Sequence, residues 1–227
     1  INDSNAHAFL RLKVKIKKEI IKLEQKNISP LLKTGEYVHP DKWDELISKK
    51  DVVIIDTRNF YESDIGTFYG SVLVNSKNFR DFSSWVRNNK EKILKKKIAM
   101  FCTGGVRCEK ASSYLISKGF KDVFQLQGGI ISYFQKTKNK NKRWIGECFV
   151  FDERVSVKDD LSKGSYVQCY ACRSPVSHIE KKSKYFKQGV YCPKCFKITS
   201  KKQKNGFEER KKQIEIAKKN GAKHLGS

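Results

Sequence analysis

A cysteine and an arginine separated by four residues are the part of this sequence best suited to chemistry. They lie in a loop that reads Cys102, Thr103, Gly104, Gly105, Val106, Arg107. An apolar run precedes this loop and a helix-like stretch follows it. Backbone N–H groups in such a loop, together with a helix N-terminus, attract an anion. They lower a thiol pKa, and the guanidinium of Arg107 adds to the effect. We therefore predict a reactive thiolate at Cys102, cradled by Thr103, Gly104, Gly105 and Val106.

The length of the loop indicates which chemistry the thiolate performs. Cysteine phosphatases have five residues between the cysteine and the arginine, which leaves room for a tetrahedral phosphate, whereas this chain has four. The tighter loop resembles the active-site loop of rhodanese-family sulfurtransferases, and this resemblance implies a persulfide sulfur carried on Cys102. The alternative is a buried structural cysteine in a tight turn, since a short motif alone is only a hypothesis.

The elements around the loop predict an α/β fold. Three apolar runs have the length of buried strands, at residues 52–56, 98–102 and 122–126. Helical patterns lie between and after them, at residues 79–86, 109–115 and 129–134. Alternating strands and helices indicate a largely parallel sheet with helices on both faces, and they place Cys102 at the carboxyl end of a central strand, where ligands bind in such sheets. Residues 36–136 as a whole resemble a rhodanese domain.

Two cysteine pairs predict a metal site in the last third of the chain. Cys169 and Cys172 form one pair, Cys192 and Cys195 the other, and 19 residues separate the pairs. This spacing is typical of a four-thiolate structural site, with zinc as the default ion. Iron stays open because tetrahedral sulfur sites serve both metals, although the residues after each pair are not the glycines usual in rubredoxin-type sites. Two disulfides are the competing interpretation.

Composition favours a polyanionic partner. The chain has 227 residues, with 48 lysines and arginines against 24 acidic residues, a net charge of +24 and a pI of about 9.7. Such a surplus attracts nucleic acid, and a merely basic surface is the alternative. No apolar run reaches the roughly 20 residues needed to span a bilayer, so we predict no membrane partner. Seven cysteines with metal-like and nucleophile spacing favour a reducing, cytoplasmic location over a disulfide framework.

Three basic regions compete as the surface that binds RNA. They are the loop at 136–144, the lysine and aromatic stretch at 181–187, and the tail at 201–223. Lysines interleaved with aromatic residues suit phosphate contact and base stacking. The RNA-binding residues that we predict from the first two regions are Lys138, Lys140, Lys142, Arg143, Lys182, Lys184 and Lys187. The tail could be a helix docked on RNA, but its weak periodicity favours disorder without a ligand.

Three motifs that occur in a fixed order make the resemblance specific to one family. They are Cys-Thr-Gly-Gly-Val-Arg-Cys-Glu-Lys at 102–110, Gly-Glu-Cys-Phe-Val-Phe-Asp-Glu-Arg-Val at 146–155, and the cysteine pair around Cys-Arg-x-Pro at 172–175. Over residues 8–196 the chain resembles the bacterial oxygen-dependent tRNA uridine-34 hydroxylases. The resemblance implies hydroxylation of the wobble uridine of tRNA to 5-hydroxyuridine, with molecular oxygen as co-substrate. It also places the family's presumed persulfide-bearing cysteine on Cys102.

The same resemblance sets the expected domain organisation. Family members begin with a ferredoxin-like domain, so residues 1–35 are expected to hold its remnant and a linker. The chain begins at Ile1 without a methionine, which is compatible with a fragment. A rhodanese domain is expected at 36–140 and a linker with the four-cysteine module at 141–200. A basic tail follows at 201–227.

Several alternatives stay open on the residues alone. Cys108 could be a second thiol that resolves a persulfide or a small residue packed in a helix, whereas the apolar surroundings of Cys148 favour a buried inert thiol. Arg58 is either a pocket residue or a structural ion-pair partner. The alternative activities are a sulfurtransferase that takes sulfur from thiosulfate or a donor protein, and a catalytically silent RNA-binding module.

The residues do not indicate a redox cofactor. The four histidines are too scattered for a two-histidine, one-carboxylate iron site, and no dinucleotide-binding glycine pattern occurs. One hypothesis for Cys102 in hydroxylation is addition of its thiolate to C6 of uracil, which would activate C5.

Overall fold

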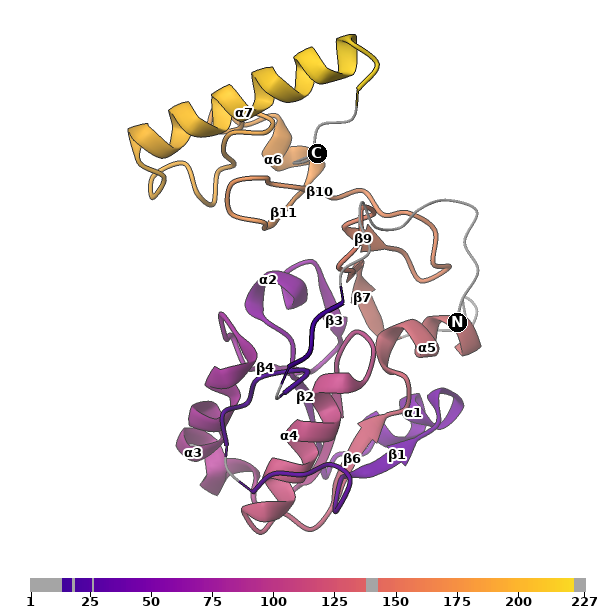
Figure 1. Ribbon diagram of the computed structural model, residues 1–227. Helices are drawn as coiled ribbons and strands as arrows, with labels where there is room; N and C mark the ends of the chain where they lie inside the picture. Colours follow the sequence, from indigo (N-terminus) through magenta and orange to yellow (C-terminus); the bar gives the residue numbers. More distant parts are fainter. Residues whose placement is uncertain (1–13, 18, 26, 138–142, 223–227) are drawn as a thin grey trace. The chain divides into compact units, whose positions relative to one another are not determined.

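The computed structural model describes residues 14–17, 19–25, 27–137 and 143–222 and divides the chain into two compact units (Figure 1). The larger unit comprises residues 15–150 and 157–163, and the smaller one contains residues 151–156 and the segment from 164 onward. Of the expected N-terminal remnant, residues 1–13 lie outside the described residues. The described residues from 14 to 35 form neither helix nor strand.

The larger unit alternates strands and helices along the chain. Its elements are β1 (Glu36–Val38), α1 (Pro40–Ile47), β2 (Val52–Asp56), α2 (Phe60–Ser63), β3 (Gly66–Phe68), β4 (Val72–Leu73), the 3₁₀-helix η1 (Phe79–Asp81), α3 (Phe82–Ile93), β5 (Lys97–Phe101), α4 (Val106–Ser117), β6 (Val123–Leu126), α5 (Gly129–Thr137), β7 (Trp144–Gly146) and β8 (Cys148–Phe149). β9 (Ser156–Val157) follows at the border between the units.

Five strands form one parallel sheet in the order β1-β6-β5-β2-β4. The central pair runs in register from Val52 opposite Lys97 to Asp56 opposite Phe101. The strand that delivers Cys102 is therefore flanked on both sides, by β2 and β6. The predicted parallel α/β sheet is confirmed. Two further strands, β3 and β7, pair antiparallel outside this sheet.

Helices cover both faces of the sheet, as the sequence predicted (Figure 1). On one face, Phe82 of α3 and Tyr114 of α4 share a hydrophobic core with Ile98 and Met100 of β5. On the other face, Trp43 of α1 and the aromatic residues of α5 pack against the alternate residues of the same strand, Ala99 and Phe101. Successive side chains of a strand point to opposite faces, so a continuous apolar run is what a strand with two buried faces requires.

Two helix N-termini meet at the carboxyl end of β5. Gly105 has φ of 85°, in the left-handed region, and immediately precedes α4. The first residues of α5 donate to the loop, with Ile130 N–H bonded to the Cys102 carbonyl at 3.0 Å and Ile131 N–H to that of Thr103 at 3.2 Å. Gly129 lies so close that an added Cβ would come within 2.5 Å of the Cys102 carbonyl oxygen. The backbone of the cysteine loop is thus fixed by a second segment of chain.

A buried ion pair closes the carboxyl end of β2. Asp56 and Arg58 are both fully buried, and the Arg58 Nη2 atom lies 2.7 Å from Asp56 Oδ2 and 2.5 Å from the Gly66 carbonyl oxygen. The guanidinium also lies 5.2 Å from the ring centroid of Trp144. Of the two interpretations of Arg58, the structure therefore supports the structural ion-pair partner.

The smaller unit is built around the cysteine pairs. Its elements are the antiparallel pair β10 (Val167–Gln168) and β11 (Pro175–Val176), the short α6 (His178–Lys181) and α7 (Lys201–Lys219). α7 differs from the disorder favoured by the sequence. Ser200 accepts from the Gln203 N–H in a capping box, and a pair between Lys187 and Glu208 ties the helix to the module. These local and tertiary bonds stabilise a helix whose apolar periodicity is weak.

No helix among the described residues combines the length and the apolar character that crossing a membrane would need.

Replacement of one partner of the Asp56–Arg58 pair should destabilise the larger unit strongly. Asp56→Ala would leave a buried guanidinium without its counter-charge, which costs on the order of 3–5 kcal/mol of unfolding free energy. The matched double variant, Asp56→Ala with Arg58→Met, removes both charges and should recover much of that loss. Urea unfolding measures both values. Equal destabilisation by the single and double variants would contradict the ion-pair interpretation.

Candidate active site and four-cysteine centre

Cys102 lies at the end of β5 with only 2% of its surface exposed. Its sulfur accepts a hydrogen bond from the Cys108 thiol and further ones from the backbone N–H groups of Arg107 and Cys108. The Cys108 thiol contributes most to lowering the pKa of Cys102, and the Arg107 charge and the two N–H groups add to it. Together they outweigh the opposing effect of burial and bring the pKa to about 6. This environment therefore favours the thiolate form of Cys102.

The donating N–H groups come from the first turn of α4, one and two residues beyond the cradle that we predicted. Within the predicted cradle, Thr103 and Gly105 are half-buried, and Gly104 and Val106 are exposed. The exposed residues lie on the open side of the loop, which is where a ligand or a terminal persulfide sulfur would approach. The role of Thr103–Val106 as a cradle stays a prediction.

Cys108 is fully buried and holds its proton. Burial raises its pKa well above the ordinary value, and the hydrogen bond with the Cys102 thiolate raises it further. The Cys108 sulfur also lies 3.7 Å from Thr57 Oγ1, whose hydroxyl donates to the Phe101 carbonyl oxygen at 2.9 Å. Because Cys108 keeps its proton while Cys102 favours the ionised form, the Cys108 thiol is the donor toward Cys102. The structure thus joins the two cysteines in one hydrogen-bonded pair.

Arg107 is held by a carboxylate that the sequence did not single out. Its Nη1 and Nη2 atoms lie 2.7 and 2.6 Å from the two carboxylate oxygens of Glu62. Glu62 is fully buried, Arg107 is 7% exposed, and the Asn59 N–H donates to Glu62 Oε2 at 3.1 Å. The charge of Arg107 is therefore largely neutralised. The spacing Asn59-x-x-Glu62, a capping signal, was the one sequence feature that could have indicated this carboxylate.

The wall beside Thr103 is built by the segment after β7. Thr103 Oγ1 lies 3.5 Å from Glu62 Oε1 and 3.5 Å from the Phe149 carbonyl oxygen. Tyr61 packs edge-on against Phe149, with ring centroids 5.3 Å apart. Cys148 is fully buried, and burial raises the pKa of its thiol to about 12. An inert buried thiol, as the sequence favoured, fits this environment.

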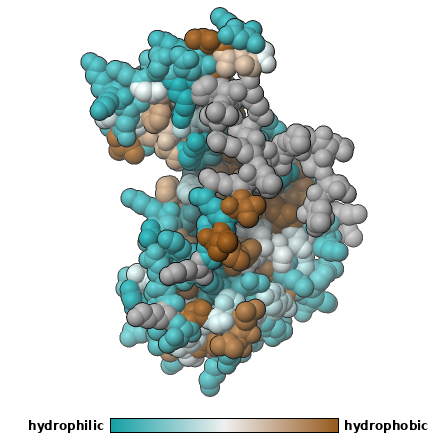
Figure 2. Space-filling model, viewed as in Figure 1, coloured by the Kyte–Doolittle hydropathy of each residue, from teal (hydrophilic) through white to brown (hydrophobic). Residues whose placement is uncertain are grey.

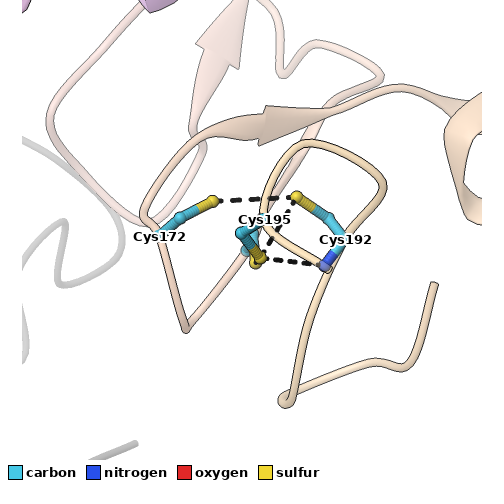
Figure 3. Close-up of side chains that lie close together, drawn as sticks. Cys172, Cys192 and Cys195 are labelled. Atoms are coloured by element: carbon cyan, nitrogen blue, oxygen red, sulfur yellow. Dashed lines mark hydrogen bonds between the residues drawn. The ribbon is translucent and has the colours of Figure 1, made fainter. Parts of the chain in front are cut away.

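The four cysteines of the smaller unit converge on one point. Their sulfur atoms all lie within 4.8 Å of one another, and Figure 3 shows those of Cys172, Cys192 and Cys195 turned toward one centre. The sulfur atoms of Cys169 and Cys195 are 3.8 Å apart, as are those of Cys192 and Cys195. Those of Cys172 and Cys192 are 3.7 Å apart. The Cys192 N–H points at the Cys195 sulfur at 3.3 Å.

These distances fit a tetrahedral metal ion. Sulfur atoms bound to zinc at about 2.3 Å lie about 3.8 Å from one another in a regular tetrahedron. Disulfides require sulfur atoms about 2 Å apart, so the geometry does not support that interpretation. The cluster can therefore hold a metal through four thiolates.

The predicted RNA-binding residues fall into three groups. Lys138, Lys140 and Lys142 lie outside the described residues. Arg143 is half-buried, and its carbonyl oxygen accepts from the Tyr69 N–H at 2.7 Å. Lys182, Lys184 and Lys187 are exposed in the smaller unit, and Lys187 pairs with Glu208 at 2.5 Å. Figure 2 shows mostly hydrophilic residues over the face of α7 that is in view.

The larger unit is similar to known rhodanese-like domains. A model of the rhodanese-like domain matches residues 39–136. The rhodanese-like domain of an Anabaena protein is similar, with 16% identity, a TM-score of 0.40 and coverage of 50% of this chain and 80% of that one. A rhodanese-like domain protein from Staphylococcus aureus shows 23% identity and a TM-score of 0.36, with coverage of 43% and 90%. The fold and the cysteine loop define a rhodanese-domain protein.

A relative with much higher sequence identity shows which family of rhodanese-domain proteins this chain belongs to. The tRNA uridine(34) hydroxylase of Acaryochloris marina is 46% identical over 224 residues, which cover 99% of this chain and 72% of that protein. The chain belongs to the tRNA uridine(34) hydroxylase family.

The Cys102–Cys108 pair gives a direct test by titration. The thiolate absorbance that Cys102→Ser removes should appear with a midpoint near pH 6, because Cys102 is a thiol below its pKa and a thiolate above it. Cys108→Ala removes the donor that contributes most to the lowered pKa of Cys102, so it should raise the midpoint. Cys108→Ser, which keeps a hydroxyl donor, is the matched control and should raise it less. A midpoint near the ordinary thiol pKa of about 8.5 in the unmodified chain would refute the arrangement.

Proposed function

We propose that this protein hydroxylates uridine 34 of tRNA at C5, with molecular oxygen as co-substrate and Cys102 as the reacting thiol. The observation that carries the proposal is the 46% identity to a tRNA uridine(34) hydroxylase over 99% of the chain, together with the intact loop from Cys102 to Arg107. A tRNA substrate implies that the protein works in the cytoplasm.

The electrostatics of the loop favour a nucleobase over a dianionic sulfur donor. Glu62 neutralises Arg107 through two hydrogen bonds, so the loop offers a dianion such as thiosulfate little net positive charge. The thiolate itself is stabilised by the Cys108 thiol and by helix N–H groups. This supports a nucleophile for a neutral pyrimidine ring. A persulfide on Cys102, supplied by a sulfur-donor protein, is the role implied by the family resemblance.

The chemistry available to Cys102 is covalent catalysis. Addition of the thiolate to C6 of uracil breaks the C5=C6 double bond and places its electron pair on C5 and the O4 carbonyl. C5 then becomes electron-rich and open to oxidation. Loss of the C5 proton and expulsion of the thiolate from C6 afterwards restore the double bond. One atom of O2 enters at C5, and the proposal requires an external two-electron donor that reduces the other atom to water. Cys102 and the donors around it are the catalytic residues of this proposal, and Glu62 positions Arg107.

We assign the four-cysteine centre to zinc in a structural role. Cys169, Cys172, Cys192 and Cys195 fill a tetrahedral shell, so no ligand position is left for substrate. The buried residues around the centre, apart from the cysteines, are few, with Val176 the main one. Metal binding would therefore supply much of the folding free energy of this module.

Loss of Cys102 should abolish the modification. In cells that lack the gene, nucleoside mass spectrometry of tRNA should show loss of 5-hydroxyuridine and its derivatives. Expression of the natural gene product should restore these nucleosides. Expression of the same product with Cys102→Ser should not. The matched control is Cys148→Ser, since Cys148 is a buried cysteine outside the proposed chemistry. Full modification by Cys102→Ser would refute covalent catalysis, and unchanged tRNA in the deletion strain would refute the hydroxylase.

The metal centre can be tested on the purified chain. We expect about one zinc ion per chain by elemental mass spectrometry, and its loss in Cys172→Ser. Cys148→Ser should keep the full zinc content. Circular dichroism should show loss of structure in the smaller unit when a chelator removes the metal. Iron in place of zinc, or a fold that is indifferent to chelation, would contradict the assignment.

A further inference from the structure

The smaller unit contains a cavity of about 360 Å³ that the metal centre and the proposed chemistry do not use. Such a volume lies near the lower end of the range of about 300–1,000 Å³ for small-molecule pockets. The lining residues on which the argument rests are Tyr170, Gln188, Gly189, Arg210, Ile214 and Glu215. They come from the tight turn between Cys169 and Cys172, here called the knuckle, from a second turn, and from one face of α7.

The cavity is a built feature of the module. Tyr170 lies between the metal-binding positions Cys169 and Cys172, so the knuckle fixes its backbone. Arg210 of α7 donates from Nη2 to the carbonyl oxygens of Tyr170 and Gly189, each at 3.3 Å. Gly189 adopts φ of 83°, a conformation that an L side chain rarely takes. The helix and the knuckle are therefore joined at the cavity itself.

The groups that line the cavity suit a flat heterocycle. The Tyr170 ring, with the residue 38% exposed, lies 5.8 Å from the Arg173 guanidinium, and Ile214 adds an apolar wall. The Gln188 amide can donate and accept, and the Glu215 carboxylate accepts from N–H groups. Lys211 also lines the cavity, and its Nζ atom lies 3.8 Å from Glu215 Oε1. The lining therefore offers cations, a paired carboxylate and an amide, which suit the mixed donors and acceptors on the edge of a nucleobase.

The segment that holds the cavity is rich in cations that a phosphate backbone could contact. Residues 164–222 contain 15 lysines and arginines against four acidic residues. Among these, Lys212 and Lys218 of α7 are exposed. Proteins bind unpaired RNA by this combination of an aromatic ring for the base and cations for the adjoining phosphates.

We propose that this cavity binds one unstacked nucleobase of the tRNA, stacked against Tyr170, while lysines of α7 contact the neighbouring phosphates. The inference rests on the proposed function, since it assigns a binding site for the same substrate. It extends RNA binding to residues that the sequence did not single out, namely Tyr170, Gln188 and Glu215.

The test measures binding of a tRNA transcript with uridine at position 34 to the full chain with its metal, by fluorescence anisotropy at several salt concentrations. Tyr170→Ala should weaken binding about tenfold, because base stacking on an aromatic side chain contributes roughly 1–3 kcal/mol. Its salt dependence should be unchanged, since no phosphate contact is lost. Tyr170→Phe keeps the ring and should retain most of the affinity. Ile214→Ala should weaken binding, and Ile198→Ala, an exposed residue of the same unit, is its control.

The outcomes separate this inference from the proposed function. If the unmodified chain binds and hydroxylates tRNA but Tyr170→Ala binds it equally well at full metal content, the cavity assignment is wrong and the function stands. If a polyglutamate peptide displaces tRNA from the unmodified chain but not from Tyr170→Ala, the cavity is an acidic-peptide site. If tRNA is neither bound nor modified, both proposals fail. Selective loss of affinity in Tyr170→Ala with rescue by Tyr170→Phe supports the assignment.

Discussion

The ion pair between Arg107 and Glu62 is the interaction on which the candidate site depends. It joins the first turn of α4 to α2 through two short, buried hydrogen bonds, at 2.7 and 2.6 Å. The same turn of α4 supplies the N–H groups that point at the Cys102 sulfur. Without the carboxylate, a buried guanidinium would face the thiolate alone, and the loop would be a strong receptor for any small anion. With it, the charge beside Cys102 is nearly balanced.

Because Glu62 neutralises Arg107, other donors contribute more to stabilising the Cys102 thiolate. The sequence indicated backbone N–H groups and a helix N-terminus as stabilisers of the thiolate, with Arg107 adding a positive charge. In the structure, the Cys108 thiol makes the largest contribution to the low pKa of Cys102, and Arg107 acts alongside the helix N–H groups. A thiolate that is stabilised mostly by short-range hydrogen bonds stays nucleophilic toward a neutral ring while it attracts fewer anionic competitors. This is the physical basis of the proposed chemistry on a pyrimidine in place of sulfur transfer from thiosulfate.

The smaller unit is stabilised mainly by polar and sulfur contacts. Its apolar core is small, so four converging sulfur atoms and the bonds from Arg210 of α7 hold it together. Because one knuckle positions both metal ligands and Tyr170, the stability of the module and the shape of its cavity are coupled. Structural metal binding and the recognition of a base would then share the same backbone.

The sequence alone determined three central strands and three helices of the larger unit, the parallel sheet, the position of Cys102 at a strand end and the four-cysteine set. These follow from local patterns: apolar runs for strands buried on both faces, glycines at turns, and fixed cysteine spacing. Only the tertiary structure decided that Glu62 binds Arg107, that Cys108 donates to Cys102, that Arg58 is a structural partner and that the basic tail is a helix with a cavity beside it. Each of these depends on contacts between residues distant along the chain, and no local pattern specifies which buried charges and donors meet.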